Sequence, residues 1–407
     1  MTTPAIVISR DSKPVADPKG GRLMSLDVLR GLAVAGMILV TDPGTYGAVY
    51  WPLLHSQWNG GTPTDMIFPA FLFAVGIAIT LSFSSRIRRG YGSARLARHV
   101  LIRSGVLFLI GLLINGFPDY NLHTLRIPGV LQRIAICYLC GSLLYLGIDH
   151  VVAGGSASWK PKMAITGGTV ILLLSGYWLL LKLVPVPGFG PGRLDTLGNL
   201  GAYLDRSIFG VRHLWAYGTT PGYGVTFDPE GLLSTLPAIA TLLIGILTGE
   251  WLGADRSLGR KALTLAGAGF VLIFMGCLLH PLLPINKKLW TSTFALFSSG
   301  VSLVIFSILY WVLDIERWRW WAFPALVFGT NAIFAFVLSS VITVLADTIH
   351  LTVKGGSTIT VHKMVYSYGF ATWLQPVRAS LAYAIAVVLL NLALVYPLYR
   401  RRIFLRL

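Results

Sequence analysis

The chain of 407 residues is 55% hydrophobic and only 12% charged, and its mean hydropathy is +0.70. About a quarter of the residues of a soluble domain are charged, so this composition predicts a membrane protein. The net charge of +17 does not indicate a nucleic-acid partner, because the basic residues stand in short clusters between apolar runs, as topology signals do.

Residues 1–24 form a cytoplasmic N-terminal segment in this prediction, and no cleavage site follows, so we expect the first apolar stretch to be a retained helix. Ten apolar stretches are long enough to span a bilayer, at approximately 25–41, 66–83, 99–116, 127–148, 163–185, 231–252, 262–284, 289–313, 322–346 and 377–399. The sequence therefore predicts an all-α polytopic membrane protein with about ten transmembrane helices and one transmembrane domain over 25–407.

Lysine and arginine are concentrated in alternate connections between these stretches, as in R-I-R-R-G at 86–90 and in the C-terminal tail. The loop 42–65 has neither residue, and Lys287 and Lys288 are the clearest exception to the pattern. Because positive loops stay in the cytoplasm, we expect both termini to be cytoplasmic and the loop 42–65 to be on the other side.

The longest connection, at about 186–230, then lies outside the cytoplasm and is rich in glycine, proline and aromatic residues. A loop of this kind is a lid, a binding element or a linker. Its aromatic side chains suit stacking on a sugar, and they equally suit the membrane interface.

Charged residues inside predicted spans are costly and often functional. Asp27 and Arg30 share one face of the first helix, where they form either a structural ion pair or part of an anion site reached from the cytoplasm. Ser25 is a candidate cap of this helix. Arg103 can extend to the cytoplasmic surface, whereas Arg133, beside Gln132, needs a partner or lines a substrate cavity.

The loop 42–65 is the most informative segment, since it places His55 between Asp42 and Asp65 with Trp58 and Asn59 nearby. A histidine beside a carboxylate can act as a general base, and the carboxylate then fixes the tautomer of the ring. The alternative is an interfacial histidine among capping residues, in which Thr64 or Asp65 caps the second helix.

Other chemistries have no support in the sequence. It has no Gly-rich phosphate-binding loop, no dinucleotide-binding fingerprint and no metal-ligand spacing, so no metal is expected. Cys137 and Cys140 form a C-x-x-C inside an apolar stretch, where helix packing is the better interpretation.

Several motifs resemble the heparan-α-glucosaminide N-acetyltransferase family, in particular its bacterial NagX-type members. They cover nearly the whole chain from Ser25 and are specific as an ordered set. The motifs are S-L-D-V-L-R-G at 25–31, P-L-L-H-S-Q-W-N-G-G-T-P-T-D at 52–65, R-I-P-G-V-L-Q-R-I at 126–134, D-P-E-G-L-L-S-T-L-P-A-I at 228–239, P-I-N-K-K-L-W-T-S-T-F at 284–294 and F-G-T-N-A-I at 328–333.

The resemblance implies acetylation across the membrane, with acetyl-CoA supplied from the cytoplasm and an amino sugar or glycan, of the glucosamine type, acetylated on the far side. It implies His55 as the catalytic base, with Asp42 or Asp65 holding the ring. Candidate substrate-binding residues in the matching motifs are Trp58, Asn59, Gln132, Arg133, Asn286 and Asn331. Candidates for binding acetyl-CoA are Asp27, Arg30 and Arg103. A bacterial inner-membrane location, a lipid bilayer as surroundings and a homodimer also fit this family.

One position departs from the family. Many relatives have an asparagine where this chain has Thr41 and Asp42. The L-R-G stretch at 29–31 is also similar to membrane acyltransferases that modify sugar hydroxyls, but those have a histidine near the position of Thr41.

Alternatives stay open from the sequence. The competing function is an inner-membrane transporter of amino sugars or N-acetylglucosamine, which an inverted repeat would favour, and none is evident. A third is a binding protein that has lost activity. For an acetyltransferase, the sequence does not separate direct transfer from an acetyl-histidine intermediate.

Overall fold

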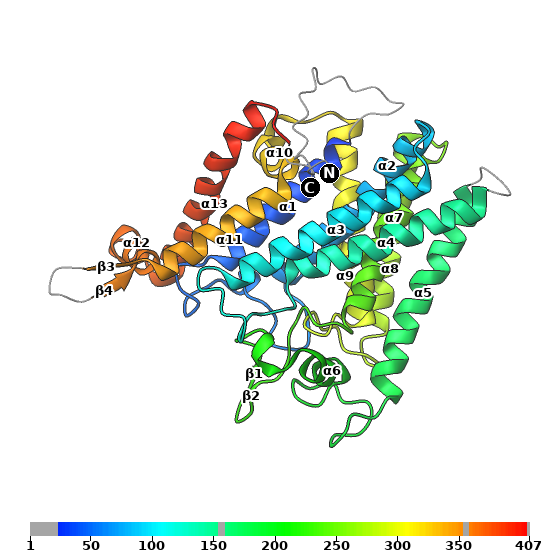
Figure 1. The fold of residues 1–407 in the computed structure, drawn as a ribbon. Coiled ribbons are helices and arrows are strands. Elements are labelled where there is room, and N and C mark those ends of the chain that lie inside the picture. Colours follow the sequence, from blue (N-terminus) through cyan, green and yellow to red (C-terminus); the bar gives the residue numbers. More distant parts are fainter. Residues whose placement is uncertain (1–22, 154–158, 353–357, 405–407) are drawn as a thin grey trace, which may run out of the picture. The chain divides into compact units, whose positions relative to one another are not determined.

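The structure is a computed structural model in which residues 23–153, 159–352 and 358–404 are described (Figure 1). Within these residues, nine helices are long and apolar enough to cross a membrane, and a bent helix pair makes a tenth candidate span. The chain is therefore a multi-pass membrane protein with an all-α fold, as predicted. Its contacts divide it into two units, one formed by both end regions of the chain and one by its middle.

Unit 1 contains residues up to Ser56, Thr62–Phe68 and residues from Val312 onward. Its helices are α1 (Met24–Thr41), α10 (Phe323–Thr330), α11 (Ala332–Thr348), α12 (Val361–Gly369) and α13 (Pro376–Arg400). A short hairpin of β3 (His350–Thr352) and β4 (Thr358–Thr360) joins α11 to α12 (Figure 1).

Helices α1 and α10 pack closely because both have glycine at their contact. A Cβ atom at Gly31 would overlap the carbonyl oxygen of Ala325, and one at Gly329 would overlap that of Asp27. Such small-residue contacts let the backbones of membrane helices approach each other. The side chain of Ser25 does not cap α1, so the prediction of a cap at this residue is wrong. Instead, the carboxylate of Asp314 accepts hydrogen bonds from the backbone amides of Met24 and Ser25, both at 3.1 Å.

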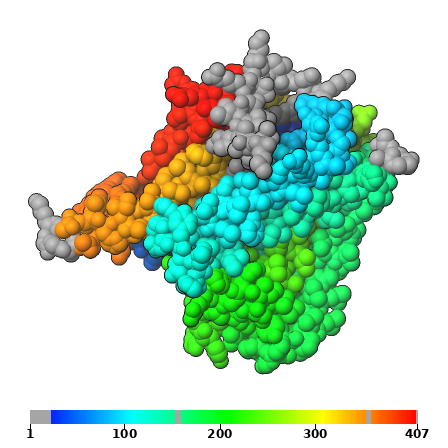
Figure 2. Space-filling model, viewed as in Figure 1, coloured from blue at the N-terminus to red at the C-terminus, as the bar shows by residue number. Residues whose placement is uncertain are grey.

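Unit 2 contains Gln57–Gly61 and Pro69–Trp311. Its long helices are α2 (Ile67–Arg88, which begins in unit 1), α3 (Ser93–Gly116), α4 (Val130–Ala153), α5 (Trp159–Leu183), α7 (Thr235–Gly253), α8 (Leu258–Leu278) and α9 (Ser292–Tyr310). Helices α2 and α7 have the largest share of buried residues among the long helices of this unit. In contrast, α3 forms an open strip of surface, cyan in Figure 2, and Leu101, Leu109 and Leu113 on it are more than half exposed. An apolar exposed face of this kind suits the hydrocarbon of a bilayer.

The ninth predicted stretch, 322–346, is not one straight helix. It breaks at Asn331, and the segments Trp320–Thr330 and Ala332–Thr348 meet at an angle of 76°. A hydropathy window averages over such a break, so the sequence pattern could not reveal it. The other nine predicted stretches coincide with single helices apart from shifts at their ends.

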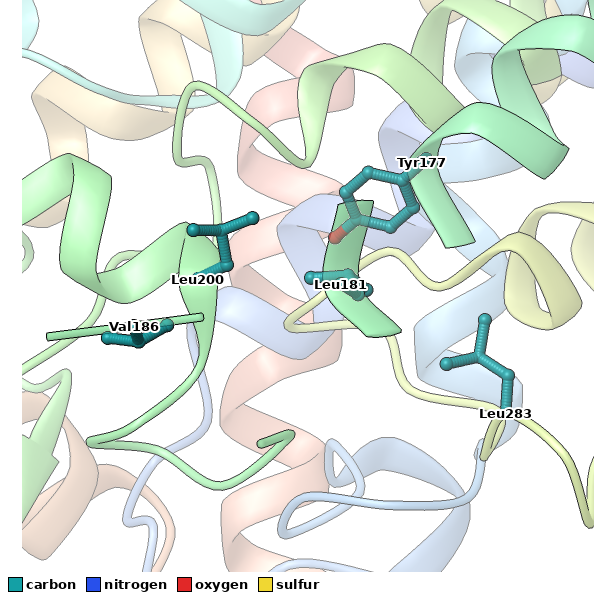
Figure 3. Close-up of a cluster of buried hydrophobic side chains, with 5 residues drawn as sticks. All are labelled: Tyr177, Leu181, Val186, Leu200 and Leu283. Carbon is teal, nitrogen blue, oxygen red and sulfur yellow. The ribbon is translucent and has the colours of Figure 1, made fainter. Parts of the chain in front are cut away.

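The long connection at 186–230 is folded. It contains α6 (Leu200–Phe209), the 3₁₀ turn Val211–His213 and a hairpin of β1 (Thr219–Thr220) and β2 (Gly224–Val225). A buried apolar cluster attaches it to the helices: Val186 and Leu200 pack with Tyr177 and Leu181 of α5 and with Leu283 (Figure 3). This connection is therefore an ordered part of unit 2 rather than a linker.

Candidate active site

The loop that carries His55 is built from two short 3₁₀ turns. Trp51–Leu53 comes first, and Pro63–Met66 leads into α2. The hydroxyl of Thr64 donates to the carbonyl of Pro52 at 2.9 Å, and that of Thr62 donates to the carbonyl of Leu54 at 2.6 Å. These two bonds tie the second turn to the first, directly beside His55.

Both oxygen atoms of Asp65 accept hydrogen bonds, from three residues in all. Its Oδ1 lies 2.7 Å from Nδ1 of His55. Its Oδ2 accepts hydrogen bonds from the backbone amides of Ser56 at 3.1 Å and Thr62 at 3.0 Å, and it lies 3.1 Å from the hydroxyl oxygen of Thr62. Thr62 and Asp65 form a capping box, in which Thr62 is the N-cap residue. The carboxylate of Asp65 therefore takes part in capping and also contacts His55, two roles that the sequence offers as alternatives.

The burial of this pair is uneven. The side chain of Asp65 is fully buried, whereas that of His55 is 48% exposed. A carboxylate accepts the proton of Nδ1, which leaves the lone pair of a neutral imidazole on Nε2. The arrangement therefore has the two parts of a general base: a ring with a defined tautomer and a buried group that orients it.

Asp42, the other carboxylate predicted beside His55, has its hydrogen bonds elsewhere. It follows the last residue of α1 and accepts hydrogen bonds from Ser339, at 3.4 Å, and from Thr343 of α11. Burial raises its pKa to about 6, although these two hydroxyls and His362 oppose the rise. The preceding Thr41 donates its hydroxyl back to Met37 of its own helix, at 2.7 Å.

The residues that follow His55 belong to unit 2 and have their own partners there. The indole of Trp58 donates to the carbonyl of Leu194 at 2.8 Å, and its ring meets Phe227 edge to face at 5.1 Å. Asn59 accepts a hydrogen bond from the side-chain amide of Asn286 at 3.1 Å. Three predicted substrate-binding residues, Trp58, Asn59 and Asn286, are thus brought together.

Gln132 and Arg133 are both buried on α4, also in unit 2. Arg133 donates to the carbonyl of Gly231, at 3.0 Å, and to Ser234, and its guanidinium lies 5.2 Å from the ring centre of Trp290. Asn331 belongs to unit 1, at the break between α10 and α11, where it donates to the carbonyl of Ile403 at 3.1 Å.

The candidates for binding acetyl-CoA belong to different units: Asp27 and Arg30 to unit 1, and Arg103 to unit 2. Arg30 forms an ion pair with Asp27 on α1, and its Nε is buried without a hydrogen-bond partner among the described residues. Arg103 belongs to α3, where its guanidinium lies 4.7 Å from the ring centre of Tyr138.

The sequence analysis missed two groups in unit 2. Lys288, noted only as an exception in the charge pattern, donates to the carbonyl of Gln57 at 2.6 Å. Arg126 binds Asp228 through two nitrogen atoms, at 2.8 and 2.6 Å, and Glu230 at 2.6 Å. Burial raises the pKa of Glu230, but the charges of Arg126, Arg133 and Lys287 together outweigh burial and hold this pKa below its ordinary value. Both groups sit in the motifs at 126–134, 228–239 and 284–294, which are the signal that could have found them.

Comparison with known proteins gives a consistent result. Residues 22–181 match the family described as heparan-alpha-glucosaminide N-acetyltransferase, catalytic. The heparan-alpha-glucosaminide N-acetyltransferase of Homo sapiens is 31% identical over 351 residues, which cover 78% of this chain and 52% of the human protein. The protein of the same name from Mus musculus is 31% identical over 366 residues, or 81% and 55% of the two chains. The chain thus spans about half the length of the curated relatives it matches.

Proposed function

Because this chain belongs to the heparan-α-glucosaminide N-acetyltransferase family, we propose that it is a membrane acetyltransferase that transfers the acetyl group of acetyl-CoA to the amino group of a glucosamine-type sugar. The observation that carries the proposal is the hydrogen bond between His55 Nδ1 and the buried Asp65. We propose a bacterial inner-membrane location, with acetyl-CoA in the cytoplasm and the acceptor on the periplasmic side, in agreement with the charge pattern.

In the proposed reaction, His55 accepts a proton from the sugar nitrogen through Nε2. The amine attacks the thioester carbonyl, a C–N bond forms, the C–S bond breaks, and the sulfur leaves as the thiolate of CoA, which then takes up a proton. Asp65 keeps the proton of His55 on Nδ1 and stabilises the imidazolium that forms. Proton transfer of this kind contributes about 10²–10⁴-fold to a rate.

The other predicted residues have supporting roles in this proposal. Trp58, Asn59 and Asn286 bind the acceptor, while Arg30, with an unsatisfied buried Nε, suits the phosphates of acetyl-CoA. We assign Asp42 to the attachment of α1 to α11 and not to the ring of His55, since its hydrogen bonds go to Ser339 and Thr343.

The test is acetyl transfer from radiolabelled acetyl-CoA to glucosamine by the purified protein in detergent. We expect transfer by the wild type and a loss of about 10²–10⁴-fold in kcat for His55→Ala. Acetyl-CoA-independent uptake of amino sugar into vesicles, without any transfer, would instead establish the transporter. A wild type that binds acetyl-CoA but acetylates no amino sugar would refute the proposed acceptor class.

Asp65→Asn is the sharper variant, because both oxygen atoms of Asp65 accept hydrogen bonds. Two backbone amides donate to Oδ2, so the new side-chain amide keeps its oxygen there and turns its NH₂ group toward His55. This forces the proton of the ring onto Nε2, where it blocks the base. In a Ser-His-Asp triad the same change lowers kcat by about 10⁴.

Thr360→Ala is the matched control for the capping role of Asp65. Thr360 is the N-cap of α12 in the same unit, and its side chain accepts from Lys363 at 3.2 Å. Loss of an N-cap costs about 1 kcal/mol of stability. Transfer should survive in this variant, and equal losses in the two variants would mean that Asp65 acts only through the fold.

A further inference from the structure

The five residues that follow Ser56 in the chain are held by several contacts within unit 2. The backbone amide of Gly60 donates to the carbonyl of Ile285 at 2.7 Å, and Asn286 donates to Asn59 at 3.1 Å. Trp58 is bound to the carbonyl of Leu194 at 2.8 Å. The segment 57–61 is therefore held at its middle and its end by neutral hydrogen bonds, and the carbonyl of Gln57 at its beginning accepts one from Lys288.

Lys288 contacts the first residue of this segment, Gln57, through its charged ammonium group. Its ammonium donates to the carbonyl of Gln57 at 2.6 Å, and it lies 5.9 Å from the ring centre of Trp58 and 5.7 Å from that of Phe227. A cation over aromatic rings is attracted by their negative faces, and a charged donor makes a stronger hydrogen bond than a neutral one. One side chain thus contacts the backbone of Gln57 and the side chain of the next residue.

The turn that presents Lys288 is itself rigid. The side chain of Asn286 is fully buried and accepts a hydrogen bond from the backbone amide of Leu289 at 2.9 Å. The carbonyl of Leu289 in turn accepts the hydroxyl of Tyr177 at 2.6 Å. Trp290, 1% exposed, has a φ of +48°, a conformation that a residue with a side chain keeps only where its surroundings enforce it.

We propose that Lys288 is a positioning residue of the transferase, which fixes the backbone directly after His55 by holding the carbonyl of Gln57. Gln57 is two residues along the chain from His55, so its carbonyl restrains the direction in which the loop leaves the histidine. This role would explain why a lysine stands in a connection that the charge pattern predicts to lie outside the cytoplasm, where basic residues are few. The inference rests on the proposed function, since it assigns Lys288 to the reaction of His55.

The neighbouring residue supplies a matched control. Lys287 carries the same charge in the same turn, and its charge lowers the pKa of Glu230. We compare Lys288→Met, Lys288→Arg and Lys287→Met in the purified full-length protein with amino sugar and acetyl-CoA. A displaced catalytic group can cost about 10²-fold in rate. We expect Lys288→Met to lower kcat by about 10–100-fold with an unchanged KM for acetyl-CoA, Lys288→Arg to restore most of it, and Lys287→Met to stay within about threefold of wild type.

A second measurement does not need activity. Backbone hydrogen exchange of the peptide that covers residues 57–61 reports whether the segment is held. We expect faster exchange in Lys288→Met and wild-type exchange in Lys287→Met and His55→Ala. Lys288→Gln, which keeps an N–H donor without the charge, should be intermediate, and it replaces Lys288→Met if that variant does not fold.

The outcomes separate the two proposals. A wild type without any acetyl transfer refutes the proposed function, while the exchange data still decide whether Lys288 holds the segment. Unchanged exchange in Lys288→Met refutes the positioning role, even if kcat falls, because Lys288 then acts by touching substrate. Faster exchange with an unchanged kcat refutes the link between this segment and the reaction.

Discussion

Asp42 is a carboxylate that is 5% exposed and accepts hydrogen bonds from two hydroxyls of α11. Burial raises its pKa above the ordinary value of 3.8 to about 6, so the folded protein holds this proton more tightly than the unfolded chain does. The unfolded chain therefore releases the proton first as the pH rises. The contribution of Asp42 to stability is largest below about pH 4, falls between about pH 4 and 6, and is constant above that range.

We predict that Asp42→Asn removes this part of the pH dependence. Relative to wild type, the variant should gain stability as the pH rises from 4 to 7, by at most about 3 kcal/mol, because a shift of one pKa unit is worth about 1.4 kcal/mol. The measurement is the melting temperature of both proteins at several pH values in one detergent. His362 and Asp347 also act on Asp42, and they stay in place in both proteins.

The exposed Asp119 offers a control for this measurement. Asp119→Asn should leave the pH dependence of the melting temperature as it is in wild type. A constant difference between Asp42→Asn and wild type over the whole range would contradict the assignment of a raised pKa to Asp42.

At the scale of helices, the contact between α1 and α10 depends on the absence of side chains. Gly31 and Gly329 each face a carbonyl oxygen of the partner helix, and no Cβ fits at either position. The same helix α1 carries Asp27 and Arg30 and leads to the loop of His55. Close packing of α1 on α10 therefore fixes the element from which two candidate sites extend.

We predict that Gly31→Ala destabilises unit 1 by about 1–3 kcal/mol, the usual cost of overpacking a close contact. Gly105→Ala in α3 is the control, since a Cβ there meets nothing within 4 Å. That change should be neutral or stabilising, because glycine inside a helix costs about 0.5–1 kcal/mol relative to alanine. The measurement is the melting temperature of both variants in detergent. Similar melting temperatures for the two would contradict the close contact of Gly31 with α10.

The sequence predicted helices well because hydropathy and length alone decide which segments span a bilayer. Short elements outside the spans, such as α6 and α12, were not predicted, since helices of ten or fewer residues are shorter than the about 11–18 residues over which hydrophobic periodicity is read. The break at Asn331 was missed for a different reason. The side-chain amide of Asn331, at the break, donates to the carbonyl of Ile403, and partners 72 residues apart leave no local pattern.

At the scale of the molecule, the charge pattern predicts which connections face the cytoplasm. We predict that Tyr223→Cys, in the exposed hairpin of the long connection, reacts with a membrane-impermeant maleimide added to intact cells. Arg89→Cys, between α2 and α3, should react only after lysis. Both variants need alanine at Cys137, Cys140 and Cys277, and the reverse pattern of labelling would invert the proposed orientation.

The candidate site was predictable only in part. A histidine between two aspartates in a loop without basic residues was visible in the sequence, but the choice of its partner was not. Asp65 lies ten residues from His55, whereas the partners of Asp42 lie 297 and 301 residues away, on a helix that no local pattern connects to it. Lys288 was seen but not understood, because its contact with Gln57 joins positions 231 residues apart.

The composition of unit 1 has a consequence for biosynthesis. Helix α1 is translated before most of unit 2, but α10, α11 and α13, which it packs against, follow only after the whole of unit 2 has been translated. Until then, Gly31 of α1 and the buried Asp42 lack the partners that α10 and α11 give them. The nascent chain must therefore wait with α1 in the bilayer, where an insertase or chaperone can shield it. Premature termination before α10 should leave this helix as a target for membrane proteases, even though unit 2 would be complete.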